Sequence, residues 1–133
     1  MNLHTLNTWA ILVAALSSFL IGGLWYSPML FVSAWKRANE FAADPPPAGP
    51  KGFLIAFLLS LVMAANLAMF LNAPGTTLAW GATAGFLAGF GWVAMGFGII
   101  AVFEHRPLRY VLINGGYVTV ALTVMGAILG AWR

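Results

Sequence analysis

Long runs of apolar residues separated by short polar segments dominate the pattern of this sequence. At about 1.5 Å per helical residue, runs of roughly 20 residues can cross a hydrocarbon core of roughly 30 Å. Four runs of this order carry no charged side chain, at residues 6–31, 53–71, 78–103 and 110–132. Because an open strand edge in lipid would leave backbone groups unpaired, each run is predicted to be a helix. The predicted fold is an all-α integral membrane protein, with residues 1–133 forming one four-helix transmembrane bundle.

The connector between the first two runs has a different pattern. Its apolar residues recur at helical spacing and its charged and amide residues take the other side: Phe31, Trp35, Ala38 and Phe41 against Lys36, Arg37, Asn39 and Glu40. A short amphipathic helix is therefore expected to lie along the cytoplasmic surface of the membrane. The DPPPAGPKG segment that follows cannot continue a helix, because proline lacks an amide hydrogen and fixes an extended backbone.

Composition excludes a water-soluble domain. Of the 133 residues 62% are hydrophobic and 7% are charged, so the charged residues cannot cover the surface of a soluble fold. Cysteine is absent, which excludes disulfides and thiolate chemistry. The formal charge of +3 lies mainly in connectors, where it indicates topology or contact with anionic membrane lipids. Nucleic acid is therefore not an expected partner.

The distribution of basic residues predicts the orientation of the chain. Two connectors hold five of the six basic side chains, and the remaining one is at the C-terminus: Lys36, Arg37, Lys51, Arg106 and Arg109 against Arg133. The positive-inside rule places these connectors, 32–52 and 104–109, in the cytoplasm and both termini outside. Aromatic residues near the span ends fit interfacial belts on the outer and inner sides, with Trp9, Trp80 and Trp132 outside and Trp25, Trp35 and Tyr110 inside. The N-terminus has no basic region before its long apolar run, so we expect it to remain attached.

Small residues in the last two spans predict close helix packing. Gly81, Gly85 and Gly89 recur at intervals of four, and Gly126 and Gly130 repeat this spacing once. Such spacing lets two helix backbones approach closely in lipid. We expect these glycines to seat other helices of the same chain, and a second subunit is the alternative. Asn66, in the second span, is expected to hydrogen-bond between helices, with a substrate contact as its alternative.

Polar side chains gather near the cytoplasmic ends of the spans, at Tyr26, Ser27, Glu104, Arg106, Asn114 and Tyr117. One interpretation is structural: Pro28 bends the end of the first span, Ser27 hydrogen-bonds the Gly23 carbonyl, and Trp25 and Tyr26 reach the headgroups. Glu104 then pairs with Arg106 or Arg109 at the surface. The other interpretation is a polar pocket that binds a small solute or a lipid.

The sequence offers little support for an enzyme, a metal site or a cofactor. His4 and His105 are predicted on opposite sides of the membrane, so they cannot form a paired-histidine metal or haem site in one chain. There is also no phosphate-binding glycine loop and no nucleophile elbow. We therefore expect neither catalysis nor a bound cofactor.

Three segments, GGLWYSPMLF, KGFLIAFLLSLVMAANLA and FEHRPLRYVLINGGYVTVALTVMGAILGAWR, resemble the domain of unknown function 1761 (DUF1761) family of small bacterial membrane proteins. The matching positions are Trp25, Tyr26, Ser27, Pro28, Trp35, Asn66, Glu104, Arg106, Pro107, Asn114, Gly116 and Tyr117. One departure is Val118, where a histidine often follows the tyrosine in such sequences. The resemblance implies four membrane helices but no agreed activity.

Two functions remain open from the sequence. The leading prediction is a structural or assembly role, as a homo-oligomer or an accessory subunit packed against a larger membrane complex. It depends on the glycine-lined third span and on the scarcity of polar residues. The alternative is a binder or transporter of a small solute or lipid, with its polar pocket on the cytoplasmic side.

Overall fold

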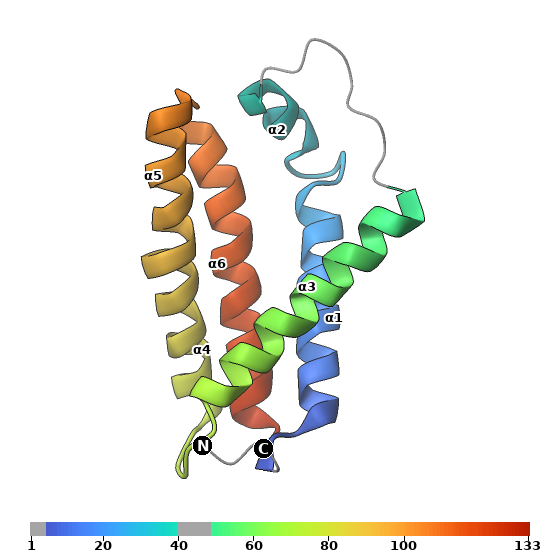
Figure 1. The fold of residues 1–133 in the computed structure, drawn as a ribbon, viewed down its shortest axis with the longest axis vertical. Coiled ribbons are helices and arrows are strands. Elements are labelled where there is room, and N and C mark those ends of the chain that lie inside the picture. Colours follow the sequence, from blue (N-terminus) through green and yellow to red (C-terminus); the bar gives the residue numbers. More distant parts are fainter. Residues whose placement is uncertain (1–4, 40–48) are drawn as a thin grey trace.

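The computed structural model describes residues 5–39 and 49–133, which are helical apart from short turns (Figure 1). Three long helices are continuous: α1 (Thr8–Trp25), α3 (Gly49–Phe70) and α6 (Leu108–Ala131). The fourth consists of α4 (Leu78–Ala88), a π-helical turn η2 (Gly89–Ala94) and α5 (Met95–Glu104). All four are long and apolar enough to cross a membrane. For the described residues, the predicted all-helical architecture is therefore confirmed, with four helices that are long and apolar enough to span a membrane.

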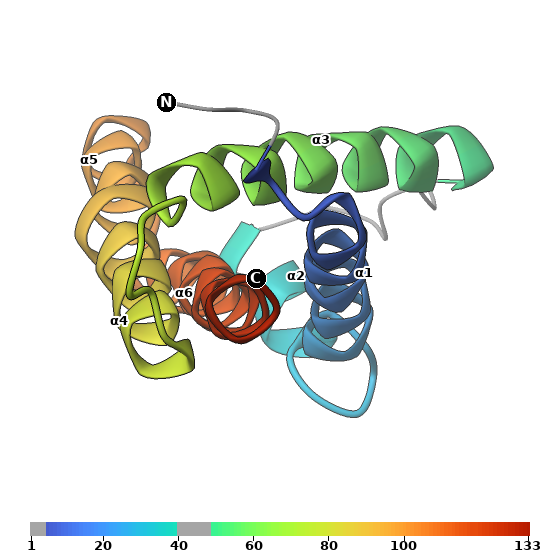
Figure 2. The same cartoon turned by 90° about the horizontal axis from the view of Figure 1, so that it is seen from below.

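Helix α6 is the centre of the arrangement. It carries the largest share of buried residues among the four long helices, with α4 and α5 along one side and α1 along the other (Figure 1). Helix α3 is inclined to the other three and lies across one side of the bundle (Figure 2). Its rings pack mainly on α1, where Phe19 makes edge-to-face contacts with Phe53 and Phe57. Helix α3 is therefore the peripheral member of the bundle.

The glycines of α4 and η2 pack against α6 of the same chain. A Cβ atom on Gly81 would overlap the carbonyl oxygen of Gly126, and one on Gly85 would overlap that of Leu122. A Cβ on Gly89 would lie 2.7 Å from Cα of Thr119. The close approach is reciprocal, because Gly126 and Gly130 meet the Gly81 and Thr77 carbonyls in the same way. Without Cβ atoms at these positions the two backbones make direct contact, where dispersion forces are effective.

The bundle is closed at one end by hydrogen bonds to backbone carbonyls. We call this the Arg133 end. The guanidinium of Arg133 donates to the carbonyls of Leu71 (2.6 Å) and Ala73 (3.2 Å), which lie just beyond the last residue of α3. Asn7 accepts the Ala10 amide to cap α1 and donates to the Trp132 carbonyl at 3.4 Å. These bonds join the start of α1, the end of α3 and the end of α6.

Helix α1 ends at Trp25, before the boundary expected at residue 31. Pro28 has no amide hydrogen to donate to the carbonyl four residues before it, which belongs to Leu24. The Leu24 carbonyl instead accepts the Ser27 hydroxyl at 2.7 Å and the Ser27 amide at 3.2 Å. The expected bond from Ser27 to the Gly23 carbonyl was wrong by one residue, because the carbonyl left unpaired by the proline is the better acceptor.

The short connector between α5 and α6 follows from its FEHRP sequence. His105 ends α5 in a left-handed conformation, with φ of 58°. The Arg106 amide then donates back to the Ala101 carbonyl at 2.9 Å, which completes a helix-ending turn. Pro107 directly precedes the first residue of α6, and its fixed φ suits the start of a helix. The α5–α6 turn thereby lies at the same end of the bundle as α2 (Val32–Asn39), opposite the Arg133 end (Figure 1). We call this the α2 end.

Candidate functional site

A cluster of hydrogen-bonded aromatic and polar side chains joins α1 to α6 near the α2 end. The Tyr26 hydroxyl donates to Oδ1 of Asn114 at 2.7 Å. The Tyr117 hydroxyl lies 3.2 Å from the Ser18 carbonyl oxygen, to which it donates, and 3.2 Å from the Ser18 hydroxyl. The Tyr26 and Tyr117 rings meet edge to face, with centroids 5.6 Å apart. We call Ser18, Tyr26, Asn114 and Tyr117 the tyrosine cluster.

Two glycines make room for the rings of this contact. A Cβ on Gly22 of α1 would lie 3.2 Å from the Tyr117 ring, and a Cβ on Gly116 of α6 would lie 2.9 Å from the Trp25 ring. The indole nitrogen of Trp25 donates to the Ile113 carbonyl at 2.9 Å. The polar groups of Trp25 and Tyr26 therefore bond to α6. The expectation that both residues reach the headgroups stays a prediction.

Sequence reasoning missed Ser18 of the cluster and Gly22, which makes room for the Tyr117 ring. The available signal was their spacing: Ser18 and Gly22 are four residues apart in α1, so they share one helix face. Two small residues one turn apart leave space for a large ring from a neighbouring helix. Their partner, Tyr117, was identified from the sequence, but nothing in the sequence pairs it with α1.

Helix α2 packs against α6. Its Trp35 ring meets the Tyr26 ring edge to face at 6.0 Å, and Ala38 is fully buried. The apolar side of α2 thus contacts protein through Trp35 and Ala38. The remaining members of the expected amphipathic segment, Glu40 and Phe41, lie outside the described residues.

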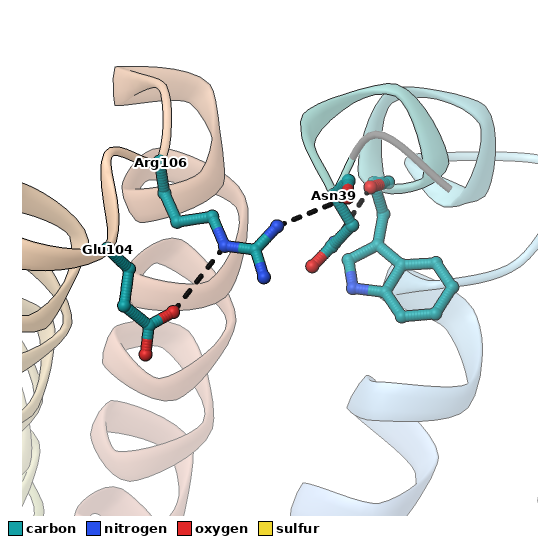
Figure 3. Close-up of polar contacts among 4 residues, drawn as sticks. Asn39, Glu104 and Arg106 are labelled. Atoms are coloured by element: carbon teal, nitrogen blue, oxygen red, sulfur yellow. Dashed lines mark hydrogen bonds and ion pairs between the residues drawn. The ribbon is translucent and has the colours of Figure 1, made fainter. Parts of the chain in front are cut away.

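Arg106 connects the α5–α6 turn to α2 (Figure 3). Its guanidinium donates to the Asn39 carbonyl at 3.1 Å, and Nε lies 3.5 Å from a Glu104 carboxylate oxygen. The Asn39 amide donates in turn to the Trp35 carbonyl at 2.8 Å. A cation is favourable at the C-terminal end of a helix such as α2. The Glu104 side chain is 51% exposed, so the ion pair itself contributes little stability.

The structure brings together three of the six residues predicted for a polar site. Tyr26, Asn114 and Tyr117 belong to the tyrosine cluster. Ser27 bonds to its own helix, while Glu104 and Arg106 form a separate exposed pair. The tyrosine hydroxyls bond within the chain, so the cluster holds helices together.

Metal coordination has no candidate site in the described chain. Among residues 5–39 and 49–133, no group of three His, Asp or Glu side chains could hold a metal ion. His105 caps α5 at the surface, and His4 lies outside the described residues.

Asn66 of α3 is exposed on the outside of the bundle. In the described parts of the chain its amide has no hydrogen-bond partner. The expectation that Asn66 bonds between helices within one chain was therefore wrong. The buried side of α3 is formed by Ser60, Ala64, Leu67 and Ala68, and the helical period turns Asn66 away from them.

The sequence profile described as protein of unknown function (DUF1761) matches residues 9–130, nearly the whole chain. The chain belongs to the DUF1761 family. The DUF1761 match runs from the first turn of α1 to the last turn of α6, so it includes the tyrosine cluster, Arg106 and Asn66. Neither a curated protein nor a solved structure matches this DUF1761 chain.

Proposed function

We propose that this protein has a structural or assembly role in the bacterial inner membrane, as a homo-oligomer or an accessory subunit of a larger membrane complex. The exposed amide of Asn66 is the observation that carries this proposal. Inside the bundle, the hydroxyls of Tyr26, Tyr117 and Ser18 already have hydrogen-bond partners. The unpaired intramembrane amide is directed outward, where a neighbouring protein can reach it. In this proposal the protein has neither catalytic activity nor a cofactor.

The proposed orientation places α2 and the α5–α6 turn in the cytoplasm and both termini in the periplasm. Arg37, Arg106 and Arg109 lie at the α2 end, as the positive-inside rule requires of a cytoplasmic end. Trp9, Trp80 and Trp132 lie near the helix ends at the Arg133 end and are all exposed. Exposed tryptophans at one end of the bundle are typical of the aromatic belt at a membrane–water interface. Helix α2 would then lie at the cytoplasmic interface, with Arg37 in the headgroup region.

Lipid binding is the second candidate, and one observation favours it. An apolar groove of about 240 Å³ lies between the third span and α6, lined by Phe90, Ala94, Met95, Val111, Leu112, Gly115, Gly116, Thr119 and Val120. Its lining suits an acyl chain. The groove has little polar surface to select a headgroup, because the Thr119 hydroxyl donates to the Gly115 carbonyl. Assembly is therefore the better-supported function.

Chemical crosslinking in native membranes, followed by native mass spectrometry in mild detergent, tests the two candidates together. Assembly predicts a homo-oligomer or a stoichiometric partner protein. A strictly monomeric chain without a partner in both measurements would contradict it. Lipid binding predicts a retained lipid that is lost when Leu112→Trp fills the groove. The matched control, Leu108→Trp, changes an exposed α6 leucine outside that lining, and it should leave the lipid bound.

A further inference from the structure

We infer that the outer side of α3 is the contact surface between two copies of this chain, with Asn66 of one copy hydrogen-bonded to Asn66 of the other. This inference rests on the proposed assembly role and names its interface. Its starting point is a residue whose chemistry does not fit the lipid around it. An amide without a partner in hydrocarbon is costly, because it loses its hydrogen bonds to water and gains none.

The outer side of α3 forms one continuous apolar surface around this amide. Leu59, Val62, Asn66 and Phe70 follow one another at spacings of three and four residues, so they share a helix face. Leu59, Val62 and Phe70 are 60%, 67% and 65% exposed. Apolar residues at this spacing with one asparagine among them resemble the seam of a helix pair, in which a single amide fixes register and partner number.

Asn66 cannot reach the headgroups by extending along its helix. Measured along the axis of α3, about 9 Å of helix, at 1.5 Å per residue, separates it from Asn72 in the turn after α3, and the depth is less because α3 is inclined (Figure 1). Side chains on a helix lean toward its N-terminus, which for α3 is the α2 end. The Asn66 amide therefore leans away from the nearer interface and toward the membrane centre. Asparagine is too short to reverse this, so the inference takes its partner from a neighbouring chain at the same depth.

A second copy satisfies that requirement directly. An amide has both a donor and an acceptor, so two asparagines related by a two-fold axis can satisfy each other. All copies insert in the same direction, which aligns the two-fold axis with the membrane normal and puts both Asn66 residues at one depth. Because α3 is inclined to the other spans (Figure 1), two such helices would cross. Contact would then concentrate around the crossing point, which the inference places at Asn66.

The glycine-lined sides of α4 and α6 are not available as the contact surface between two copies. Gly81, Gly85, Gly126 and Gly130 are already in contact between α4 and α6. A different partner protein would need its own polar group opposite Asn66, whereas a second copy supplies one at the right depth. The outer side of α3 therefore fits a homodimer.

Single cysteines test the inference in native membranes, since the sequence contains none. Val62→Cys puts a thiol one turn from Asn66 on the proposed interface. Leu87→Cys on α4 is the matched control, because Leu87 is also a membrane-embedded and exposed apolar residue, at 55%. Mild oxidation should yield a disulfide-linked dimer from Val62→Cys and little from Leu87→Cys.

Changes at Asn66 in the Val62→Cys background test the amide itself. Asn66→Leu should reduce the yield of crosslinked dimer about tenfold, as expected for the loss of a pair of intramembrane hydrogen bonds. Asn66→Gln keeps the amide and should restore most of the yield. Far-UV circular dichroism confirms that each variant is folded.

The outcomes separate this inference from the assembly proposal. A dimer that forms through Leu87→Cys alone, or a different protein crosslinked to Val62→Cys, would overturn the α3 homodimer and leave the assembly role intact. Equal crosslinking with and without Asn66→Leu would also overturn the inference, because the amide would then not be the contact. A monomer with no partner in any variant would overturn both proposals and leave lipid or water as the partner of Asn66.

Discussion

The contact between α4 and α6 and the outer side of α3 represent two extremes of helix packing in this molecule. Between α4 and α6, glycines bring two backbones together until no Cβ atom could fit. On the outer side of α3, large apolar side chains that are mostly exposed surround an amide. Because lipid is as apolar as leucine, burial alone gives little drive to associate. Close backbone packing and polar bonding remain. The α4–α6 contact uses the first, and the proposed contact through Asn66 would use the second.

The difference shows which surface is available to a partner. A glycine stripe in a membrane helix is commonly taken as a docking surface, but in this chain α6 occupies it. A single polar residue in a span has no spacing that indicates a helix contact. In this chain, however, Asn66 lies on the side of α3 that no other helix of the described residues covers. The predictions below alter the two regions and the contacts between them, in decreasing order of expected effect on stability.

Gly85→Ala should have the largest effect. Its methyl group would overlap the Leu122 carbonyl oxygen on the α6 backbone, which cannot move aside without shifting the helix. We expect a loss of about 2–3 kcal/mol in the free energy of unfolding. Titration with a denaturing detergent, followed by far-UV circular dichroism, measures it.

Gly91→Ala is the matched control on the same long helix. No atom lies within 4 Å of a Cβ at Gly91, so its methyl would extend into lipid. Alanine also favours a helix over glycine by up to about 1 kcal/mol, and we therefore expect unchanged or slightly higher stability. Equal destabilisation by both substitutions would contradict the tight α4–α6 contact.

Tyr26→Phe should have the next largest effect, at the contact between α1 and α6. It removes the hydroxyl that donates to Asn114 and leaves that amide oxygen without its donor. The expected loss is about 1–2 kcal/mol, measured by the same titration. Tyr110→Phe is the control, because the Tyr110 hydroxyl makes no hydrogen bond to the described residues. A stability of Tyr26→Phe equal to that of this control would show that the Tyr26 bond contributes nothing.

Much of the fold was predictable, because four uncharged runs in lipid permit little besides four helices. The glycine spacing of the third span also indicated a close helix contact. Distances between helices were not predictable. No periodicity shows that Tyr117 reaches Ser18, or that Arg106 reaches the end of α2. The bond from Trp25 to α6 was not predicted, and the bond expected for Asn66 is not made within the described chain. Which side of a helix meets protein depends on how the helices are arranged.

Arg133→Gln should have a smaller effect, at the Arg133 end of α3. The guanidinium binds the carbonyls of Leu71 and Ala73, which have no continuing helix to pair with. Since Arg133 is exposed, we expect a loss of only about 1 kcal/mol. Hydrogen exchange should show faster opening at the end of α3. Arg109→Gln removes the same charge from another exposed arginine, and no change in exchange at α3 is expected from it.

Asn66→Leu should have the smallest effect on the stability of a single chain. Asn66 makes no hydrogen bond in the described parts of the chain, so its replacement removes no contact within one copy. In dilute detergent, where the monomer is favoured, we expect a change of less than about 0.5 kcal/mol in the free energy of unfolding. In membranes at high protein density the same substitution should lower apparent stability, because a bound second copy stabilises the fold by mass action. A large loss already in the monomer would mean that Asn66 supports its own bundle, and the contrast between α3 and the α4–α6 contact would then fail.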